Sequence, residues 1–543
     1  MLDFSTWNQY SRWGVKGGWL TFWVTVACTA DMTLFGYDQG VFGGVIVTDD
    51  FLTTLHLRGP LHTSMLGTVT AIYDVGCFFG AISAVYLGEK LGRKNSILWG
   101  TLTMAIGGIL QVSASTVPHM ITGRIISGLG NGINTATAPT WQGETSQAKW
   151  RGKLVVLEMV FNIGGYSLSN WITLAFSYLS GPISWRFPLA FQFFFILIIF
   201  ATVPWLPESP RWLIQKDRFE EATRIVADLE SKEVNDARVL AIVDDIRCMV
   251  VAEAQQGASW LRILTGSSEK DETSSFRRLI LGITAQAMSQ LSGINVTSYY
   301  LPTVLIQSVG LSHELARLLT ACNSISYLIA GCFSVLVIER LGRRKLLLTC
   351  AAGQSLCYLM ITVLLRFNEK SGLENEKAVA SASVGFFFAY YLFFGLGFQS
   401  IPWLYPVEIN SLAMRTKGTA LSSATNWAFN FMVVEVTPVG IQNLKWKFYI
   451  IWTVLNASFV PIAYFFFPET AGRSLEDVDR YFRENSDIFV HRIPDATSRK
   501  RPEKYSLLEA DHIAEQGFNA LKRDHIQENE PSVGHEEILA EQV

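Results

Sequence analysis

Residues 88–94 read GEKLGRK and residues 339–345 read ERLGRRK, so one short basic motif occurs twice, each time between long uncharged runs. Two more pairs repeat in the same order. Glu144 and Glu408 are each followed by an arginine seven residues later, and PES at 207–209 is matched by PET at 468–470. The offsets are similar: 250 residues from 93 to 343, 264 from 144 to 408, and 261 from 208 to 469. This spacing predicts two halves that descend from one duplicated unit of about six membrane spans.

Composition places the chain in the membrane. It has 543 residues, of which 49% are hydrophobic and only 17% are charged, and its mean hydropathy is +0.25. Residues 187–206, 378–407 and 448–468 carry no charge at all, and about 20 apolar residues suffice to cross the hydrocarbon layer. A soluble protein with buried helices needs only short apolar runs, and such long runs would not recur along its chain. We therefore expect an all-α membrane protein.

The order of the apolar runs predicts twelve membrane-spanning helices in two halves of six. The expected spans are 18–43, 63–88, 95–114, 119–142, 152–178 and 185–206, then 278–309, 312–338, 345–366, 380–408, 413–439 and 445–467. We divide the chain into an N-terminal segment (1–17), a first half (18–206), a linker (207–277), a second half (278–467) and a tail (468–543). The charged linker, with leucine, isoleucine and alanine at helical spacing in residues 217–232, predicts amphipathic helices.

Charge sets the expected orientation and excludes some partners. Lysine and arginine fall in alternate short loops, around residues 90–94, 149–153, 340–345 and 415–417, and the positive-inside rule assigns such loops to the cytoplasm. Both termini and the linker are then cytoplasmic, and the first residues do not read as a cleaved signal peptide. A net charge of −3 predicts no nucleic-acid partner, and the seven cysteines lack the spacing of a metal site. We expect no metal and no cofactor.

Six motifs in order resemble the sugar porter family of the major facilitator superfamily. They are FGYDQG at 35–40, GRIISG at 123–128, PESPRW at 207–212, QLSGIN at 290–295, ERLGRR at 339–344 and PET at 468–470. The match covers residues 18 to about 480, and its wording is most similar to fungal and yeast members, including the branch that holds a glycerol/proton symporter. The resemblance implies the major facilitator fold and transport of a sugar or polyol by alternating access, with the plasma membrane as the expected location.

The resemblance assigns the repeated acids and arginines to a cytoplasmic gate. In the family such groups form salt bridges that close the cytoplasmic side when the cavity faces outward. Each partly exposed bridge contributes about 1 kcal/mol, so the network can open in every cycle. A simpler interpretation, basic loops that only follow the positive-inside rule, does not explain the acids at matched spacing. The expected gate residues are Arg93, Glu144, Arg151, Glu208, Arg211, Glu339, Arg343, Glu408, Arg415 and Glu469.

Acids inside membrane spans are costly and usually functional. Asp38 and Arg124 match the pair that proton-coupled sugar porters use, in which protonation frees the acid from the arginine. The alternative is a permanent structural ion pair in a facilitative uniporter, because passive members sometimes keep the acid. Asp31, Glu158 and Glu435 are further acids within the expected spans, and their roles stay open.

A sugar site needs amides for paired hydrogen bonds and aromatic walls for the ring face. The residues that match the family's binding motifs are Gln290, Asn295, Tyr299, Asn426, Trp427, Asn430, Trp403 and Phe398. Any one of the amides can instead serve helix packing. Ser289, Met159 and Tyr327 stand where related porters place amides. Fewer amides favour a smaller polyol, a different sugar or a disaccharide held elsewhere.

The sequence therefore predicts a sugar transporter that works as a proton symporter, with the sugar, the proton and the lipid bilayer as its partners. A facilitative uniporter and a polyol symporter are the alternatives with the same fold. The alternative from another class is a nutrient sensor that does not transport, but both gate motifs are intact here. No Ser/His arrangement or acid/His cluster points to an enzyme.

Overall fold

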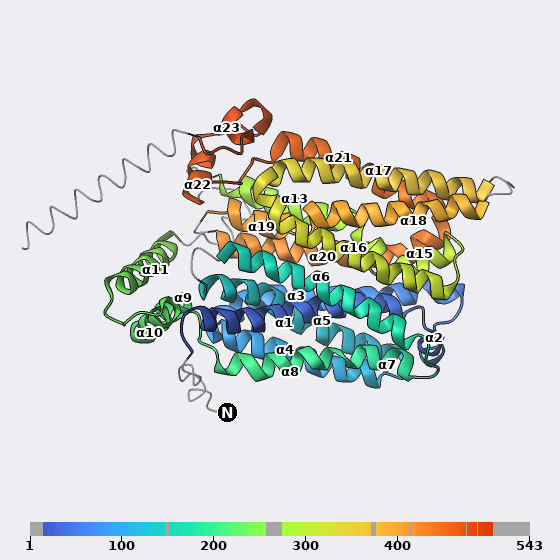
Figure 1. Cartoon of the computed structure of the whole chain (residues 1–543), viewed down its shortest axis with the longest axis horizontal. Coiled ribbons are helices and arrows are strands. Elements are labelled where there is room, and N and C mark those ends of the chain that lie inside the picture. Colours follow the sequence, from blue (N-terminus) through green and yellow to red (C-terminus); the bar gives the residue numbers. More distant parts are fainter. Residues whose placement is uncertain are drawn as a thin grey trace, which may run out of the picture.

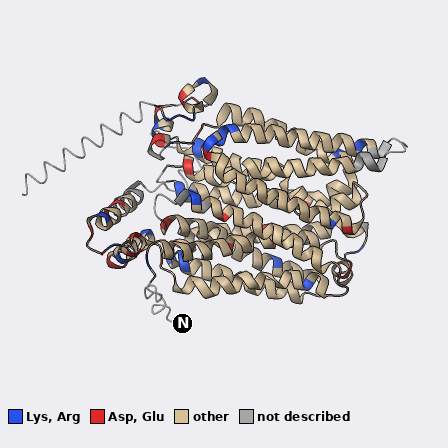
Figure 2. Ribbon diagram, in the orientation of Figure 1, with Lys and Arg blue, Asp and Glu red and all other residues tan. Residues whose placement is uncertain are grey.

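The computed structural model describes residues 15–146, 151–256, 274–370, 376–411, 414–473, 475–485 and 487–502. Every regular element in these residues is a helix. Long helices lie side by side in an elongated bundle, and the small helices of the linker and tail gather at one end of it (Figure 1). We call this end the linker end. Lysine, arginine, aspartate and glutamate also concentrate there (Figure 2).

Six spans form the first half. They are α1 (Gly18–Val45), α3 (Thr63–Leu91), α4 (Arg93–Ser113), α5 (Val117–Glu144), α6 (Arg151–Phe176), and the pair α7 (Ile183–Ala190) and α8 (Gln192–Thr202), which together make one span. The short α2 (Asp49–Thr54) lies in the loop at the far end. The linker then supplies α9 (Pro210–Gln215), α10 (Phe219–Glu230) and α11 (Ala237–Gln256), so α10 falls in the segment expected to be an amphipathic helix.

The second half repeats this arrangement, but two of its spans are broken. One consists of α13 (Ser275–Leu291), α14 (Ile294–Ser298) and α15 (Leu301–Gln307), and the other of α18 (Glu376–Phe393), a π-helical turn at Phe394–Phe398 and α19 (Ile401–Ile409). The unbroken spans are α16 (His313–Leu341), α17 (Arg343–Lys370), α20 (Arg415–Leu444) and α21 (Phe448–Phe466). The first break lies at Gly293, whose φ of 90° favours glycine. Polar groups can face the interior at such breaks.

The described helices supply the expected twelve spans in two halves of six. By length and apolarity alone, seven stretches of the described residues qualify as spans, and one of them, Lys417–Phe466, holds both α20 and α21. The spans below this threshold are α1, α5, α6 and α13–α15. These four carry buried polar residues such as Asp38, Arg124, Glu158 and Gln290. These four spans therefore bring polar side chains into the interior of the bundle.

The two halves meet through α3 against α20 and through α6 against α16. Within the first half, α3 crosses α5 so closely that a Cβ at Gly76 would lie 2.3 Å from the Ile125 carbonyl oxygen. A Cβ at Gly80 would lie 2.2 Å from the Leu129 carbonyl oxygen. Small residues of this kind allow membrane helices to approach backbone to backbone. The crossing places Asp74 of α3 opposite the arginine of α5.

Candidate functional site

Arg124 of α5 is fully buried in the first half. Its Nη2 donates a 2.7 Å hydrogen bond to the carbonyl oxygen of Thr70. The guanidinium lies over the ring of Phe42 at 4.0 Å and over the ring of Tyr73 at 4.6 Å. These contacts hold a cation inside the bundle by cation–π attraction and one carbonyl, while its Nε and Nη1 have no hydrogen-bond partner.

Two carboxylates accompany this single cation. Asp38 of α1 is fully buried and accepts a 3.5 Å hydrogen bond from the Ser127 hydroxyl through one oxygen, while its other oxygen has no partner. Asp74 lies one helical turn after Thr70, is also fully buried, and has no partner for either oxygen. Both carboxylates interact electrostatically with Arg124. Asp74 was not predicted from the sequence, although an acid within an apolar span is itself a sign of function.

The expected Asp38–Arg124 pair is brought together as neighbours and not as a closed ion pair. Within the described residues, no ion pair joins either aspartate to Arg124. The arginine is instead engaged by Thr70 and two rings. We define Asp38, Asp74 and Arg124 as the charge cluster.

Tyr299 reaches the charge cluster from the second half. It ends α14, is buried, and its hydroxyl has no hydrogen-bond partner. The hydroxyl interacts electrostatically with Asp74, Arg124 and Asp38. The backbone of Tyr299 also packs against α1, because a Cβ at Gly43 would lie 2.8 Å from its carbonyl oxygen. The residue expected to bind substrate thus interacts electrostatically with the charge cluster across the interface between the halves.

Three of the expected binding amides form one cluster in the second half. Gln290 donates a 2.6 Å hydrogen bond to the amide oxygen of Asn426 and accepts one from the amide of Asn295. The cluster joins α13, α14 and α20 next to the break at Gly293. All three side chains are buried. We call these residues the amide cluster.

Two further residues of α20 lie beside the amide cluster with unused polar atoms. Trp427 is buried, its ring packs edge-on against Phe35 of α1 at 5.6 Å, and its indole N–H has no hydrogen-bond partner. Asn430 lies one turn after Asn426, is fully buried, and both its amide atoms lack a partner. A buried amide without a partner costs about 1–3 kcal/mol, so these atoms are available to a polar ligand between the halves.

The two expected aromatic residues near α19 differ in their surroundings. Trp403 is half-buried on α19. The fully buried ring of Phe398 packs on Phe394 and on Phe459 of α21. These contacts all lie within the second half, where α21 also packs against α17.

A second polar chain crosses between the halves at the π-helical turn. Gln399 donates to the amide oxygen of Asn162 on α6 at 3.3 Å and accepts a hydrogen bond from the Tyr327 hydroxyl of α16. Tyr327 stands where related porters have an amide, and its hydroxyl binds the amide of Gln399 instead. Met159, the other departure, is buried three residues before Asn162. Sequence reasoning missed Gln399, whose signal is an amide directly after the GLGF segment at 395–398.

The three other acids within the membrane spans lie outside the charge cluster. Asp31 accepts a 2.7 Å hydrogen bond from Asn134 of α5. Glu158 of α6 is fully buried, has no hydrogen-bond partner for either oxygen, and interacts electrostatically with Asp31. Glu435 of α20 accepts a 2.7 Å hydrogen bond from Thr68 of α3, across the interface between the halves.

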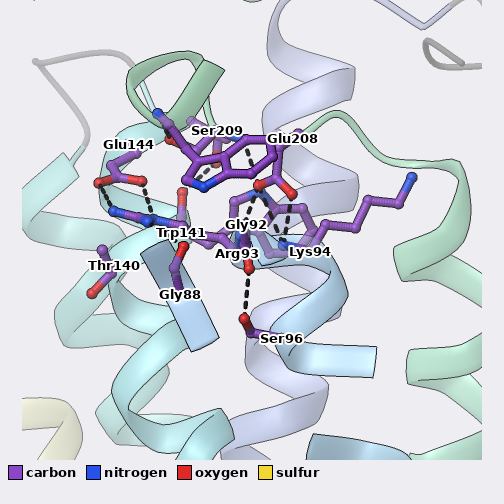
Figure 3. A network of polar contacts seen from close by, with 12 residues as sticks. Gly88, Gly92, Arg93, Lys94, Ser96, Thr140, Trp141, Glu144, Glu208 and Ser209 are labelled. Carbon is purple, nitrogen blue, oxygen red and sulfur yellow. Dashed lines mark hydrogen bonds and ion pairs between the residues drawn. The ribbon is translucent and has the colours of Figure 1, made fainter. Parts of the chain in front are cut away.

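The gate motif of the first half joins three helices at the linker end (Figure 3). Arg93 donates from Nε and Nη2 to the two oxygens of Glu144 at 2.9 and 3.1 Å, and from Nη1 to the Gly88 carbonyl. The paired geometry ties the start of α4 to the end of α5. Glu208 lies apart from this pair, above the backbone of Arg93 and Lys94.

The second half repeats the same contacts. Arg343 pairs with Glu339 at 2.7 Å and with Glu408 at 2.8 Å, so it joins the start of α17 to the ends of α16 and α19. Glu408 also accepts a hydrogen bond from the Thr470 hydroxyl at 2.6 Å. Even the supporting bonds repeat, because Trp141 donates to the Pro207 carbonyl and Tyr405 donates to the Pro468 carbonyl.

Glu208 and Glu469 contact backbone amides and not arginine side chains, which differs from the salt bridges that we expected. Glu208 accepts from the N–H groups of Arg93 and Lys94 at 2.9 and 3.2 Å. Glu469 accepts from those of Arg343 and Arg344 at 2.8 and 3.2 Å. Glu208 thus caps the N-terminus of α4, and Glu469 caps the N-terminus of α17. Unpaired N–H groups and the helix dipole favour a negative charge at these positions.

Each of the three described ion pairs of the gate, Arg93–Glu144, Arg343–Glu339 and Arg343–Glu408, lies within a single half. Arg211 lies in the first turn of α9 and Arg415 at the start of α20. The side chain of Arg151 lies outside the described residues. The gate contacts therefore consolidate the linker end of each half separately.

Comparison with known proteins agrees with this geometry. The family model described as "Sugar (and other) transporter" matches residues 23–482. The chain is 57% identical to the MFS-type transporter oryC of Aspergillus oryzae, over 92% of each chain. It is 34% identical to the Sugar transporter STL1 of Saccharomyces cerevisiae, over 88% of this chain and 83% of that protein.

Solved structures show the same fold. The proton:xylose symporter XylE, bound to 6-bromo-6-deoxy-D-glucose, superposes with a TM-score of 0.72 at 22% identity, covering 86% of this chain and 100% of that one. The family match spans both halves and both gate motifs. The chain is accordingly a multi-pass membrane transporter and not an enzyme, and it belongs to the sugar transporter family of the major facilitator superfamily.

Proposed function

We propose that the protein is a proton-coupled symporter that carries a sugar or a small polyol across the plasma membrane. The linker end and both termini face the cytoplasm in this proposal. The observation that carries it is the charge cluster, in which one buried cation faces two buried carboxylates. The described relatives give further support, since STL1 is named a sugar transporter and XylE a proton:xylose symporter.

Charge balance makes the cluster a proton site. One guanidinium can neutralise only one of the two carboxylates, and a second bare carboxylate in the bundle interior is very costly. A proton on one of the two carboxylates removes that cost. The alternative of a permanent structural ion pair is disfavoured because Arg124 is engaged by Thr70, Phe42 and Tyr73 instead.

We infer that α14 and the residue after it couple substrate binding to the protonation of the charge cluster. Asn295 belongs to the amide cluster and lies on α14. Tyr299, four residues later and directly after this short helix, interacts with the charge cluster. A substrate hydroxyl that bonds to the amides therefore moves the element that carries the Tyr299 hydroxyl. The protonation state of Asp38 and Asp74 then affects the position of α14, and the position of α14 affects the protonation state. Linked binding requires this reciprocity.

The substrate class follows from the available polar atoms. The amide cluster, both atoms of Asn430 and the indole N–H of Trp427 offer donors and acceptors beside an aromatic face. This is the chemistry that binds a polyhydroxylated molecule. Met159 and Tyr327 reduce the number of amides, so a polyol or a sugar with fewer contacts fits better than a hexose held in the usual pose.

The halves are joined at the end opposite the linker. There, Arg317 donates to the Val47 carbonyl at 2.9 Å. Nearer the middle of the bundle, the Tyr166 hydroxyl donates to the Ser298 carbonyl at 3.3 Å. Within the proposal, this end faces outward and is closed. The gate contacts at the linker end then stiffen each half while the halves rock about the central polar residues.

The test is uptake by yeast cells that lack their own sugar transporters. Radiolabelled hexoses, pentoses, disaccharides and glycerol are supplied in parallel, at external pH 5 and pH 7.5. We expect one of them to accumulate faster at pH 5, because the proton gradient is larger. Uptake of none of these solutes, with the protein present at the cell surface, would contradict the substrate class. Uptake that is equal at both pH values would favour a uniporter.

A further inference from the structure

A cavity of about 690 Å³ opens at the linker end of the second half, away from the charge and amide clusters. It lies where the tail folds back over the start of α17. The Glu469 N–H donates to the Ala496 carbonyl at 2.8 Å, and the Arg499 guanidinium donates to the Arg340 carbonyl. The short helix α23 (Pro494–Thr497) leads directly into the cavity wall.

The cavity has an excess of positive charge. Its basic lining residues are Arg340, Arg344, Lys345, Arg499 and Lys500. None of them takes part in an ion pair among the described residues. The one acid in the wall, Glu469, directs its carboxylate at the backbone N–H groups that begin α17 and at those of Thr470 and Ala471. One carboxylate, which also stabilises the helix terminus and interacts electrostatically with Arg344, cannot balance five cations, so the cavity keeps a net positive charge.

Arg344 is held in place at the cavity wall and still has an unused donor. Its Nη2 donates to the Tyr464 carbonyl at 2.6 Å, and its guanidinium lies over the Tyr464 ring at 5.1 Å. Its Nε is buried without a hydrogen-bond partner. A guanidinium held at a fixed position on the cavity wall is suited to pair with an anionic oxygen.

The first half provides an internal comparison. The repeat places Trp212 beside its motif, where a Cβ on Gly92 would lie 3.3 Å from the indole, and the Trp212 N–H donates to the Glu89 carbonyl. The equivalent position in the second half is Arg473, which donates to the Ser498 carbonyl at 3.1 Å and leaves the space to the tail. The space beside the motif is thus filled by the Trp212 ring in the first half, and the equivalent space in the second half is open and lined by basic residues.

We propose that this cavity binds clustered phosphate groups, such as those of a phosphorylated inositol headgroup. Two basic residues of the tail and three of the motif converge on it, and multiple cations at fixed positions are what polyphosphates require. Leu341 at the rim is 39% exposed and Tyr464 at the end of α21 is 44% exposed, so an apolar surface adjoins the cavity. A bound headgroup would fasten the tail to the second half. A lipid source rests on the proposed cytoplasmic orientation, because inositol lipids belong to that leaflet.

The test uses the purified full-length protein in detergent and measures its thermal unfolding temperature. The probes are short-chain phosphatidylinositol 4,5-bisphosphate, soluble inositol 1,4,5-trisphosphate and short-chain phosphatidylcholine. We expect a saturable stabilisation by the bisphosphate lipid and none by phosphatidylcholine. Stronger binding of the lipid than of the trisphosphate assigns a membrane source, and equal binding assigns a soluble one.

Matched variants locate the site. Arg499→Gln with Lys500→Gln should weaken the apparent affinity by about tenfold or more, because two charge-assisted contacts are lost. Arg483→Gln with Arg492→Gln removes the same charge from exposed residues of the tail outside the cavity, and it should leave the affinity unchanged. Equal weakening by both pairs, or stabilisation by phosphatidylcholine as large as by the bisphosphate lipid, would overturn the proposal. Transport is not measured here, so failure would leave the proposed symport untouched.

Discussion

At the residue scale, the interior of this protein is organised around a few uncompensated polar groups. Asp38, Asp74 and Arg124 are fully buried, as are both amide atoms of Asn430. Groups of this kind destabilise a membrane helix unless a proton, a substrate or a neighbouring helix satisfies them. In the proposed function, the transported species bind at these groups.

The first prediction concerns Asp38. Asp38→Asn should abolish accumulation of substrate against its gradient and leave exchange of substrate between the two sides, because an amide cannot carry the proton yet keeps the hydrogen bond from Ser127. Uptake and exchange are measured in membrane vesicles. The control is Glu435→Gln, since an amide oxygen there can still accept from Thr68, and it should accumulate substrate normally. Accumulation by Asp38→Asn at the wild-type level would contradict the role.

Asp74 should behave like Asp38, although it was not identified from the sequence. Asp74→Asn replaces the second acid beside Arg124, and we expect accumulation to fall by at least about tenfold because Arg124 then balances the one remaining carboxylate and the cluster no longer needs a proton. Equilibrium exchange should persist, which separates loss of coupling from loss of folding. If Asp74→Asn keeps the wild-type dependence of uptake on external pH, Asp38 is the proton site by itself.

The amide cluster should set the apparent affinity. Gln290→Ala, Asn295→Ala and Asn426→Ala should each raise the half-saturating concentration, since an amide–hydroxyl hydrogen bond is worth about 1 to 2 kcal/mol, or roughly 5- to 30-fold. Surface expression is measured alongside to separate binding from assembly. Wild-type kinetics in all three variants would mean that these amides serve only helix packing.

At the element scale, the two motif copies act as matched helix-capping units. Gly92 and Gly342 have φ values of 85° and 86°, and a Cβ there would lie 2.4 and 2.3 Å from an oxygen of Glu208 and Glu469. Glycine therefore allows the chain to turn and the carboxylate to approach the helix terminus. Each cap fixes where α4 or α17 begins, and hence where Arg93 or Arg343 meets its acid.

Much of this scale is predictable from sequence, because length, apolarity and repeated motifs act along the chain. The twelve spans, the duplication and the amphipathic helix α10 are all visible in this way. The roles of Glu208 and Glu469 were not, since an acid at fixed spacing from an arginine is equally consistent with a side-chain pair and a backbone cap. Gln399 and Asp74 were missed because their partners lie on helices distant in the sequence.

The caps give a stability prediction. Gly342→Ala should lower the unfolding free energy by about 1–3 kcal/mol, because it combines an unfavourable φ with a clash against Glu469. Gly385→Ala is the matched control, as no atom lies within 4 Å of a Cβ there, and alanine is favoured in a helix interior. Thermal unfolding in detergent measures both. Equal stability of the two variants would show that the cap is not needed.

At the scale of the whole molecule, two similar halves enclose polar residues contributed by both. The amide cluster belongs to the second half and the charge cluster to the first, while Tyr299 and the Gln399–Asn162 hydrogen bond connect them across the interface. Rocking of the halves therefore changes both sites together. In the proposed symport, this division allows a proton and a solute bound at different residues to be transported as one event.

The most direct measurement of that claim is proton movement during transport. The purified protein is placed in liposomes that contain a pH-sensitive dye, with the membrane potential clamped, and the solute identified by the yeast uptake panel is added outside. We predict that the lumen acidifies as the solute enters, and that Asp38→Asn liposomes admit the solute by exchange without acidification. Entry of the solute at an undiminished rate with no change in lumenal pH in the wild type would contradict proton-coupled transport.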